Sequence, residues 1–106
     1  MESDNLYLEH ILEAIGKIDR YTAGLDFQKF DKNELVQDGV VRELEIIGEA
    51  AKHISEKFRT YHPAILWTDI SGMRNKLIHE YFGVDAEIVW KTVTEDLPKL
   101  KSALGN

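Results

Sequence analysis

Cysteine is absent from the 106 residues, which excludes disulfides, thiolate catalysis and cysteine-ligated zinc sites. Long apolar runs are absent too, since none approaches the roughly 18 residues that a membrane-spanning helix needs. The first four residues, from Met1 to Asp4, are acidic and lack the basic and apolar regions of a signal peptide. We therefore expect a cytoplasmic protein that makes no contact with membranes.

Basic residues are scarce: 13 Lys and Arg face 19 Asp and Glu, and the net charge is -6. A protein dedicated to nucleic-acid binding normally has a basic field, so we expect no DNA partner. The charge leaves room for a nuclease that holds RNA with a few local Arg and Lys residues, or for an acidic surface that docks a basic protein. The 43% of hydrophobic residues can build a core unaided, and the length predicts a single domain over residues 1–106.

Apolar residues recur at spacings of 3 and 4, which predicts an all-α fold. The first helix is expected to start after Ser3 or Asp4 and to end at Gly24, and Asp26 is expected to cap a short turn. Further helices are expected over residues 33–58 and 67–82, separated by a loop at 60–66, and a last helix capped by Asp85. Pro98 must kink or restart that helix, with Asp96 as a possible cap. The prediction is a bundle of four to five helices.

The long helix at 33–58 carries a wide apolar surface, so it should be central to the bundle and is a candidate dimer surface. Gly48 lies in its interior, where glycine costs about 1 kcal/mol relative to alanine. The expected compensation is the close approach of a neighbouring backbone, from the same chain or from a partner.

The helix predicted at 67–82 has a buried stripe of Ile70, Met73 and Leu77. Because each residue turns a helix by about 100°, Asn75 and His79 lie on the opposite face, near each other at i, i+4. Arg74 lies far from His79 around the same helix. A two-fold partner helix would bring two copies of each residue into one cleft.

Such residues can cleave RNA without a metal. The neutral imidazole of His79 can take the proton of a ribose 2′-hydroxyl, and the guanidinium of Arg74 can hold the phosphate and stabilise transition-state charge. The amide of Asn75 can orient either group. Spacing alone does not distinguish this site from a solvated Arg and a surface His, and on spacing alone the solvated pair is the better interpretation.

The segment from Arg74 to Tyr81 reads R-N-x-x-x-H-x-Y, which is similar to the active-site signature of HEPN domains, and the trailing Tyr is typical of the HepT branch. The segment from Val41 to Ala51 resembles the central helix of that branch, and Trp67 to Met73 resembles its approach to the motif. The tail from Val84 to Pro98 matches as well. The resemblance covers the chain from about Asn33 onward and shows no departure from the motif.

This resemblance implies a HEPN-type helical bundle that dimerises, with the paired motifs in one composite cleft. It implies a metal-independent endoribonuclease that uses no cofactor and acts as the toxin of a toxin–antitoxin pair. Arg74 and His79 would be catalytic, and Asn75 would support them. Tyr81 would accept AMP from the partner, a nucleotidyltransferase antitoxin of the MntA type, and this modification would block the toxin.

Plainer roles remain for several of these residues. Tyr81 flanks the Leu77 stripe, so it can equally be a half-buried aromatic. Glu49 and His53, at i, i+4, are most simply a solvated ion pair, although Glu49 can also be imagined orienting the motif. Glu45 and Glu49 form a tempting metal pair, but no third ligand is in view.

Two other function classes stay open. The first alternative is a non-catalytic helical module that binds a nucleotide or a protein and regulates it, which the acidic charge favours. The second is a purely structural dimerisation bundle. His62 is expected in a loop, and Trp67 and Trp90 are expected to be core or interface anchors.

Overall fold

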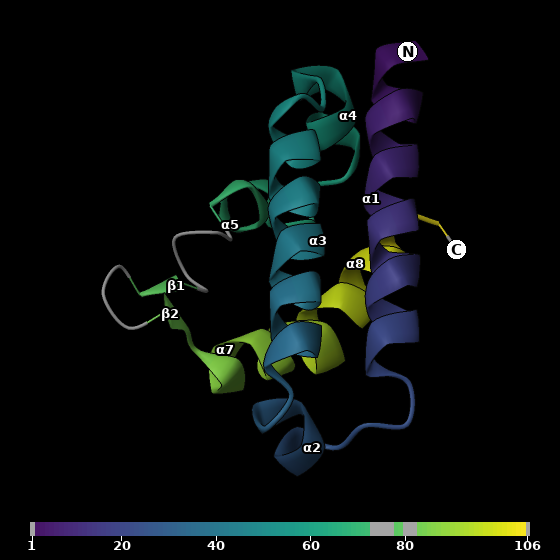
Figure 1. The fold of residues 1–106 in the computed structure, drawn as a ribbon. Coiled ribbons are helices and arrows are strands. Elements are labelled where there is room, and N and C mark those ends of the chain that lie inside the picture. The colour runs from purple at the N-terminus through teal and green to yellow at the C-terminus, as the bar shows by residue number, and fades with distance from the viewer. Residues whose placement is uncertain (1, 73–77, 80–82, 106) are drawn as a thin grey trace.

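The computed structural model describes residues 2–72, 78–79 and 83–105 (Figure 1). Its elements are α1 (Glu2–Thr22), α2 (Phe27–Asp31), α3 (Glu34–Lys52), α4 (Glu56–Tyr61), α5 (Trp67–Ser71), β1 (Ile78–His79), β2 (Gly83–Val84), α7 (Ala86–Lys91), a π-helical turn (Thr92–Asp96) and α8 (Leu97–Ala103). The predicted all-α bundle is confirmed, and the two-residue strands β1 and β2 are the exception among the described residues. Within these residues, no helix is both long and apolar enough to cross a membrane.

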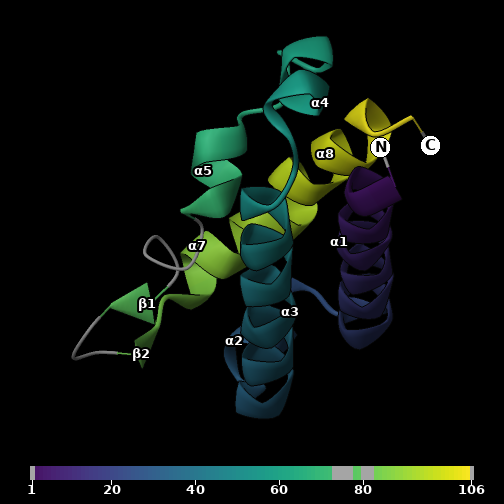
Figure 2. The same cartoon turned by 90° about the horizontal axis from the view of Figure 1, so that it is seen from above.

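Helices α1 and α3 lie side by side and antiparallel at the centre of the molecule (Figure 1). Their facing stripes are buried and comprise Ile11, Ile15 and Ile18 of α1 with Val40, Leu44 and Ile47 of α3. Helices α7 and α8 cross one side of this pair, as Figures 1 and 2 agree, and α2 packs against both α3 and α7. Removing each large apolar side chain from water stabilises the bundle by about 1.5–3 kcal/mol. Helix α3 packs against both α1 and α2, so it is the central helix, as predicted.

Local capping residues set several helix ends as expected. Gly24 has a φ of +76° and follows the end of α1. The Asp26 carboxylate accepts a hydrogen bond of 2.9 Å from the Lys29 N–H at the start of α2. The Asn33 side chain does the same at the start of α3, with the Val36 N–H at 3.1 Å. These caps satisfy backbone donors that a helix start leaves unpaired.

The predicted helix over 33–58 is wrong at its end, because α3 stops at Lys52 and α4 begins a separate helix at Glu56. Ser55 caps α4, since its hydroxyl oxygen accepts from the Phe58 N–H at 3.2 Å. Asp4, which we expected at the start of α1, instead lies inside that helix, buried at 3% exposure. Its carboxylate accepts from the Ser55 hydroxyl at 2.6 Å and from the Ser55 N–H at 2.8 Å.

These two hydrogen bonds have an electrostatic consequence. Both donors favour the ionised carboxylate, the hydroxyl more than the N–H, and they hold the pKa of Asp4 below its ordinary value. Asp4 thus ties the N-terminal end of α1 to the α3–α4 junction across 51 residues of chain.

Arg59 occupies the other side of that junction. Its Nη2 donates to the carbonyl oxygen of Ala51 at 2.6 Å, and its Nε donates to that of Ile54 at 3.2 Å. The guanidinium therefore binds two carbonyls at the α3–α4 junction, one of which, that of Ala51, also accepts from the Ile54 N–H at 3.3 Å. Together, Asp4 and Arg59 explain why the chain turns here although its apolar periodicity continues.

The C-terminal helix shows the predicted interruption before Pro98. Asp85 caps α7, accepting from the Ile88 N–H at 3.2 Å. The Leu97 N–H then reaches back five residues to the Thr92 carbonyl, so Thr92–Asp96 forms a π-helical turn and α8 restarts with Pro98 in its first turn. A proline in that turn costs no hydrogen bond. Asp96 stands at the cap position but makes no side-chain cap bond.

Candidate active site

Helix α5, which leads into the R-N-x-x-x-H-x-Y segment, lies directly against Gly48 of α3. A β-carbon placed on Gly48 would be 3.1 Å from the carbonyl oxygen of Ile70 and 3.6 Å from that of Ser71. The predicted close approach of a backbone at Gly48 is confirmed, and the neighbour belongs to the same chain. Any side chain at position 48 would press on the last turn of α5.

Trp67 anchors the other end of α5. Its ring is buried, and its Nε1 donates to the carbonyl of His62 at 3.3 Å. The guanidinium of Arg59 lies 5.7 Å from the ring centre, a cation–π distance. The expectations that Trp67 is a core anchor and that His62 follows a helix in a loop are confirmed. Trp90 packs beside Phe30, with ring centres 5.0 Å apart.

The helix predicted over 67–82 ends early, because α5 stops at Ser71. Ile78 and His79 have extended backbone and pair antiparallel with Val84 and Gly83 respectively. Gly83 therefore lies in a strand instead of ending a helix. Ile and Val are β-branched and favour extended backbone, a local preference that the helical period obscured.

Of the four predicted site residues, the structure describes one, His79. Arg74, Asn75 and Tyr81 lie outside the described residues, as do Met73 and Leu77 of the expected stripe. His79 belongs to β1, where its backbone faces Gly83. The placement of His79 opposite a helical stripe is corrected, since its backbone is not helical.

The elements on either side of residues 73–82, α5 and β2, both contact the same helix, α3. On one side α5 packs on α3 at Gly48, and on the other β2 contacts α3 before leading into α7. Figures 1 and 2 show β1 and β2 on the side of α3 that faces away from α1. The motif is therefore bracketed by two attachments to one face of α3.

A groove of about 340 Å³ runs along that face, next to the end of α5. The described residues that line it are Arg42, Glu45, Ile46, Gly48, Glu49, Lys52 and Ser71. The Ser71 hydroxyl oxygen is buried and has no hydrogen-bond partner in the part of the chain that the structure describes. A buried hydroxyl of this kind is a candidate ligand contact.

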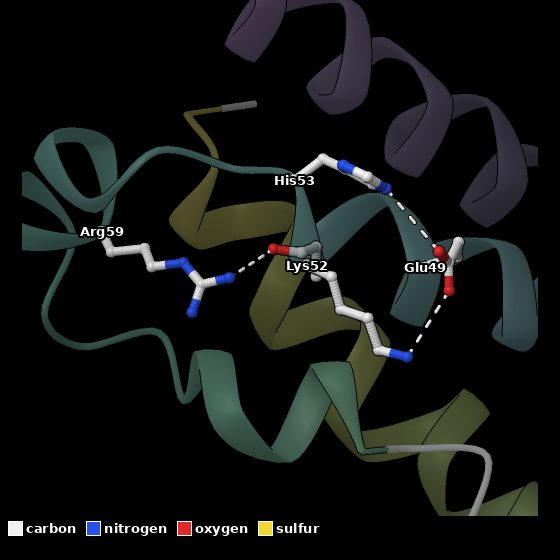
Figure 3. A network of polar contacts seen from close by, with 5 residues as sticks. Glu49, Lys52, His53 and Arg59 are labelled. Carbon is white, nitrogen blue, oxygen red and sulfur yellow. Dashed lines mark hydrogen bonds and ion pairs between the residues drawn. The ribbon is translucent and has the colours of Figure 1, made fainter.

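Glu49 is the centre of a polar network on the groove (Figure 3). Its Oε2 lies 3.5 Å from Lys52 Nζ and its Oε1 lies 3.6 Å from His53 Nε2. All three side chains are more than half exposed, with Glu49 at 66%. Contacts this long between exposed groups contribute at most a few tenths of a kcal/mol. The interpretation of Glu49 and His53 as a solvated pair is confirmed.

Three groove residues were not identified from the sequence: Arg42, Lys52 and Ser71. A signal for the first two exists, because polar residues recur at 42, 45, 49 and 52, the spacing of one helix face. Nothing in the sequence singles out Ser71, whose position depends on how α5 packs. Among the described residues, no three His, Asp or Glu side chains are grouped to hold a metal ion.

Comparison with known proteins defines the class to which this bundle belongs. The family model described as "Ribonuclease HepT-like" matches residues 11–105. The chain belongs to the HepT-like ribonuclease family. No solved structure matches it significantly.

Curated relatives extend over most of the chain. A protein named "Probable ribonuclease HepT" from Thermococcus cleftensis is 50% identical over 95 residues, covering 90% of this chain and 86% of its own. A protein from Caldanaerobacter subterraneus, named as a candidate RNase, is 43% identical over 101 residues, covering 95% and 90%. A candidate RNase from Methanocaldococcus jannaschii is 42% identical over 95 residues, covering 90% and 87%.

Proposed function

We propose that this protein is a metal-independent endoribonuclease in which Arg74 and His79 are catalytic and Asn75 supports them. The observation that carries the proposal is the intact R-N-x-x-x-H-x-Y segment in a member of a ribonuclease family. Two features of the described structure support it. Both ends of the segment attach to one face of α3, and that face holds a polar groove large enough for part of an RNA strand.

The reaction is an internal transfer at phosphorus. His79 takes the proton of a ribose 2′-hydroxyl, and the 2′-oxygen attacks the adjacent phosphorus. The bond from phosphorus to the 5′-oxygen breaks, which leaves a 2′,3′-cyclic phosphate and a 5′-hydroxyl. Arg74 stabilises the charge on the phosphate oxygens. A protonated imidazole gives the leaving oxygen its proton.

We propose that this second imidazole is the partner subunit's His79, so that a homodimer forms one composite cleft. A single imidazole cannot act as base and acid in the same step, and a two-fold axis supplies the second copy without another residue type.

The biological role that we propose is that of a cytoplasmic toxin, with residues 1–106 acting as one domain. Its antitoxin is a nucleotidyltransferase of the MntA type. That enzyme transfers AMP from ATP to the Tyr81 hydroxyl and releases pyrophosphate. The added phosphate is anionic, so it repels the RNA phosphate from a site two residues from His79.

The nuclease proposal is tested by incubating single-stranded RNA with the purified protein in excess EDTA. Wild type should cleave and leave 2′,3′-cyclic phosphate ends, and Arg74→Ala and His79→Ala should each lose at least about 10²-fold in rate. Lys57→Ala, an exposed change on α4, serves as the control. Cleavage that survives His79→Ala unchanged would refute the mechanism.

The composite site has its own test. Inactive Arg74→Ala and His79→Ala chains are mixed and allowed to exchange subunits. Mixed dimers should regain part of the cleavage, because the one composite cleft then combines an intact Arg74 with an intact His79 from different chains, while water must replace the second imidazole as the acid. No recovery, despite subunit exchange shown by mass spectrometry, would place the whole site in one chain.

AMP transfer is tested by incubating the protein with ATP and the nucleotidyltransferase. Mass spectrometry should find a single AMP adduct on Tyr81, and Tyr81→Phe should prevent it. An adduct on another residue would rule out this assignment.

A binding module is the second candidate, and the net charge of -6 on the chain favours it. Glu45 and Glu49 line the same surface as Arg42 and Lys52, so the described lining carries no net charge. If wild type cuts no RNA in EDTA yet binds a nucleotide, and His79→Ala still binds it, the protein is a non-catalytic regulatory module.

A further inference from the structure

The groove on α3 has a positive charge at each end. Arg42 and Lys52 are ten residues apart on one helix, so their positions are separated by about 15 Å along its axis. Between them lie Glu45, Ile46, Gly48 and Glu49, and Ser71 lines the groove where α5 ends. The distance exceeds the length of one nucleotide, so the two cations can contact different phosphates of one strand.

We propose that this groove is a subsite for single-stranded RNA, in which Arg42 and Lys52 bind backbone phosphates and Glu49 reads a ribose 2′-hydroxyl. The inference deepens the proposed function, because it rests on RNA being the substrate and assigns residues outside the motif to its recognition. It concerns strand binding and the choice between RNA and DNA. It assigns no bond-breaking role to any groove residue.

Arg42 is available for a phosphate. Its side chain is exposed, and it forms no ion pair with another residue that the structure describes. The planar guanidinium matches the geometry of phosphate oxygens and binds them through paired hydrogen bonds. An exposed cation on a protein of net charge -6 is a local positive site in a negative field.

Lys52 can turn from Glu49 to a phosphate at little cost. Its Nζ lies 3.5 Å from Glu49 Oε2, and both side chains are more than half exposed (Figure 3). That contact is at the long limit of a hydrogen bond, and water screens it. The two non-bridging oxygens of a phosphodiester, which share its negative charge, offer the ammonium a comparable partner.

Glu49 provides the discrimination. A carboxylate between two phosphate contacts repels any strand, and with DNA nothing offsets the repulsion. With RNA, a 2′-hydroxyl can donate a hydrogen bond to the carboxylate, and this hydroxyl is the group by which proteins distinguish RNA from DNA. In a groove that bound strands only by attracting their phosphates, a carboxylate at this position would weaken binding.

Ser71 lines the groove where it meets α5. Its hydroxyl oxygen is buried and unpartnered among the described residues, so its donor and acceptor capacity is unused. In the sequence, Ser71 precedes Arg74 by three residues.

Binding is measured by fluorescence anisotropy in the His79→Ala chain, with a labelled RNA decamer and a DNA decamer of matched sequence. Arg42→Ala and Lys52→Ala should each weaken RNA binding about tenfold and reduce the salt slope, log Kd against log salt, by about 0.7. Glu49→Ala should tighten DNA binding and reduce the preference for RNA over DNA. A structural role for Glu49 would weaken both ligands together.

Matched controls are the neighbouring exposed residues Glu56 and Lys57 of α4, which lie outside the groove. Glu56→Ala and Lys57→Ala change the net charge equally but should leave the RNA preference and the salt slope as in wild type. Circular dichroism verifies that each variant folds.

The outcomes separate this inference from the nuclease proposal. If wild type cleaves RNA and the Arg42 and Lys52 variants bind RNA as tightly as their parent, the groove is not a subsite and the nuclease stands. If RNA binds with these dependences but is not cut, the subsite stands and the nuclease fails. If neither binding nor cleavage occurs, both fail. If Arg42→Ala changes only sedimentation, the groove is a protein interface and the inference is overturned.

Discussion

Substituting Gly48 by alanine tests whether the packing of α5 on α3 positions the motif. In an exposed helix interior, this change would raise the free energy of unfolding by about 1 kcal/mol, because alanine restricts the unfolded chain and favours helix. In this protein the new β-carbon meets the Ile70 carbonyl oxygen at 3.1 Å and the Ser71 carbonyl oxygen at 3.6 Å. Both atoms are backbone, so no side chain can rotate away, and α5 must move by a few tenths of an ångström.

The two effects oppose each other, and their sizes decide the sign. Forcing a backbone shift by overpacking typically costs about 1–3 kcal/mol, which exceeds the helix-propensity gain. We expect Gly48→Ala to lower stability by about 1 kcal/mol, a fall in Tm of roughly 4–8 °C for a chain of this size. Because α5 leads directly into the motif, RNA cleavage should fall by on the order of three- to tenfold at temperatures where the variant is fully folded.

Gly16 of α1 is the matched control. A β-carbon there would meet only the end of the flexible Arg20 side chain, at 3.8 Å, an ordinary contact. Gly16→Ala should therefore raise stability by up to about 1 kcal/mol with cleavage unchanged. Urea denaturation and a cleavage assay on both variants give the comparison. If Gly48→Ala is as stable as Gly16→Ala and cuts RNA like wild type, the close packing does not position the motif.

Changes at three further residues test the junction between α3 and α4. Ser55→Ala removes the cap of α4 and should lower the free energy of unfolding by about 1 kcal/mol in urea denaturation. The pKa of Asp4 is lower in the folded chain than in the unfolded one, so the contribution of Asp4 to the free energy of unfolding is present above about pH 4 and is lost as the pH falls further. Asp4→Asn should flatten that part of the profile of stability against pH. An unchanged profile would contradict the assignment. Arg59→Ala should cost about 1–3 kcal/mol, because the Ile54 carbonyl loses its side-chain donor and the Ala51 carbonyl keeps only backbone donors. Arg59→Lys should recover only part of this, since an ammonium cannot donate to both carbonyls and also stack on Trp67; a fully stable Lys variant would show that the planar fork is unnecessary.

Features that depend on neighbours in sequence were predictable. Gly24 ends α1, and Asp26 and Asp85 cap helices, because these effects act within one turn of chain. Pro98 forces a break because its ring and missing N–H act on its own helix. The close contact at Gly48 was also predictable. Glycine destabilises a helix interior by about 1 kcal/mol relative to alanine, so its presence there indicates a compensating contact.

Features that depend on distant residues were not predictable. The apolar period continues past Lys52, yet α3 ends there. Asp4 hydrogen-bonds to Ser55 and Arg59 to the Ala51 carbonyl, and these bonds hold the turn between α3 and α4. Nothing near Ser55 reveals that its partner is 51 residues away. The extended backbone at His79 was missed for a related reason. The apolar spacing around it predicts a helix, and only its pairing with Gly83 shows a strand.

The segment from Arg74 to Tyr81 shows the same division. Its residue types and spacing are a property of the chain alone, and with the flanking segments they were enough to identify the family. Where the segment attaches was decided by packing, since α5 approaches α3 closely at Gly48. The groove of Arg42, Lys52 and Ser71 is likewise tertiary, because it exists only where two helices distant in sequence meet and leave a polar face uncovered.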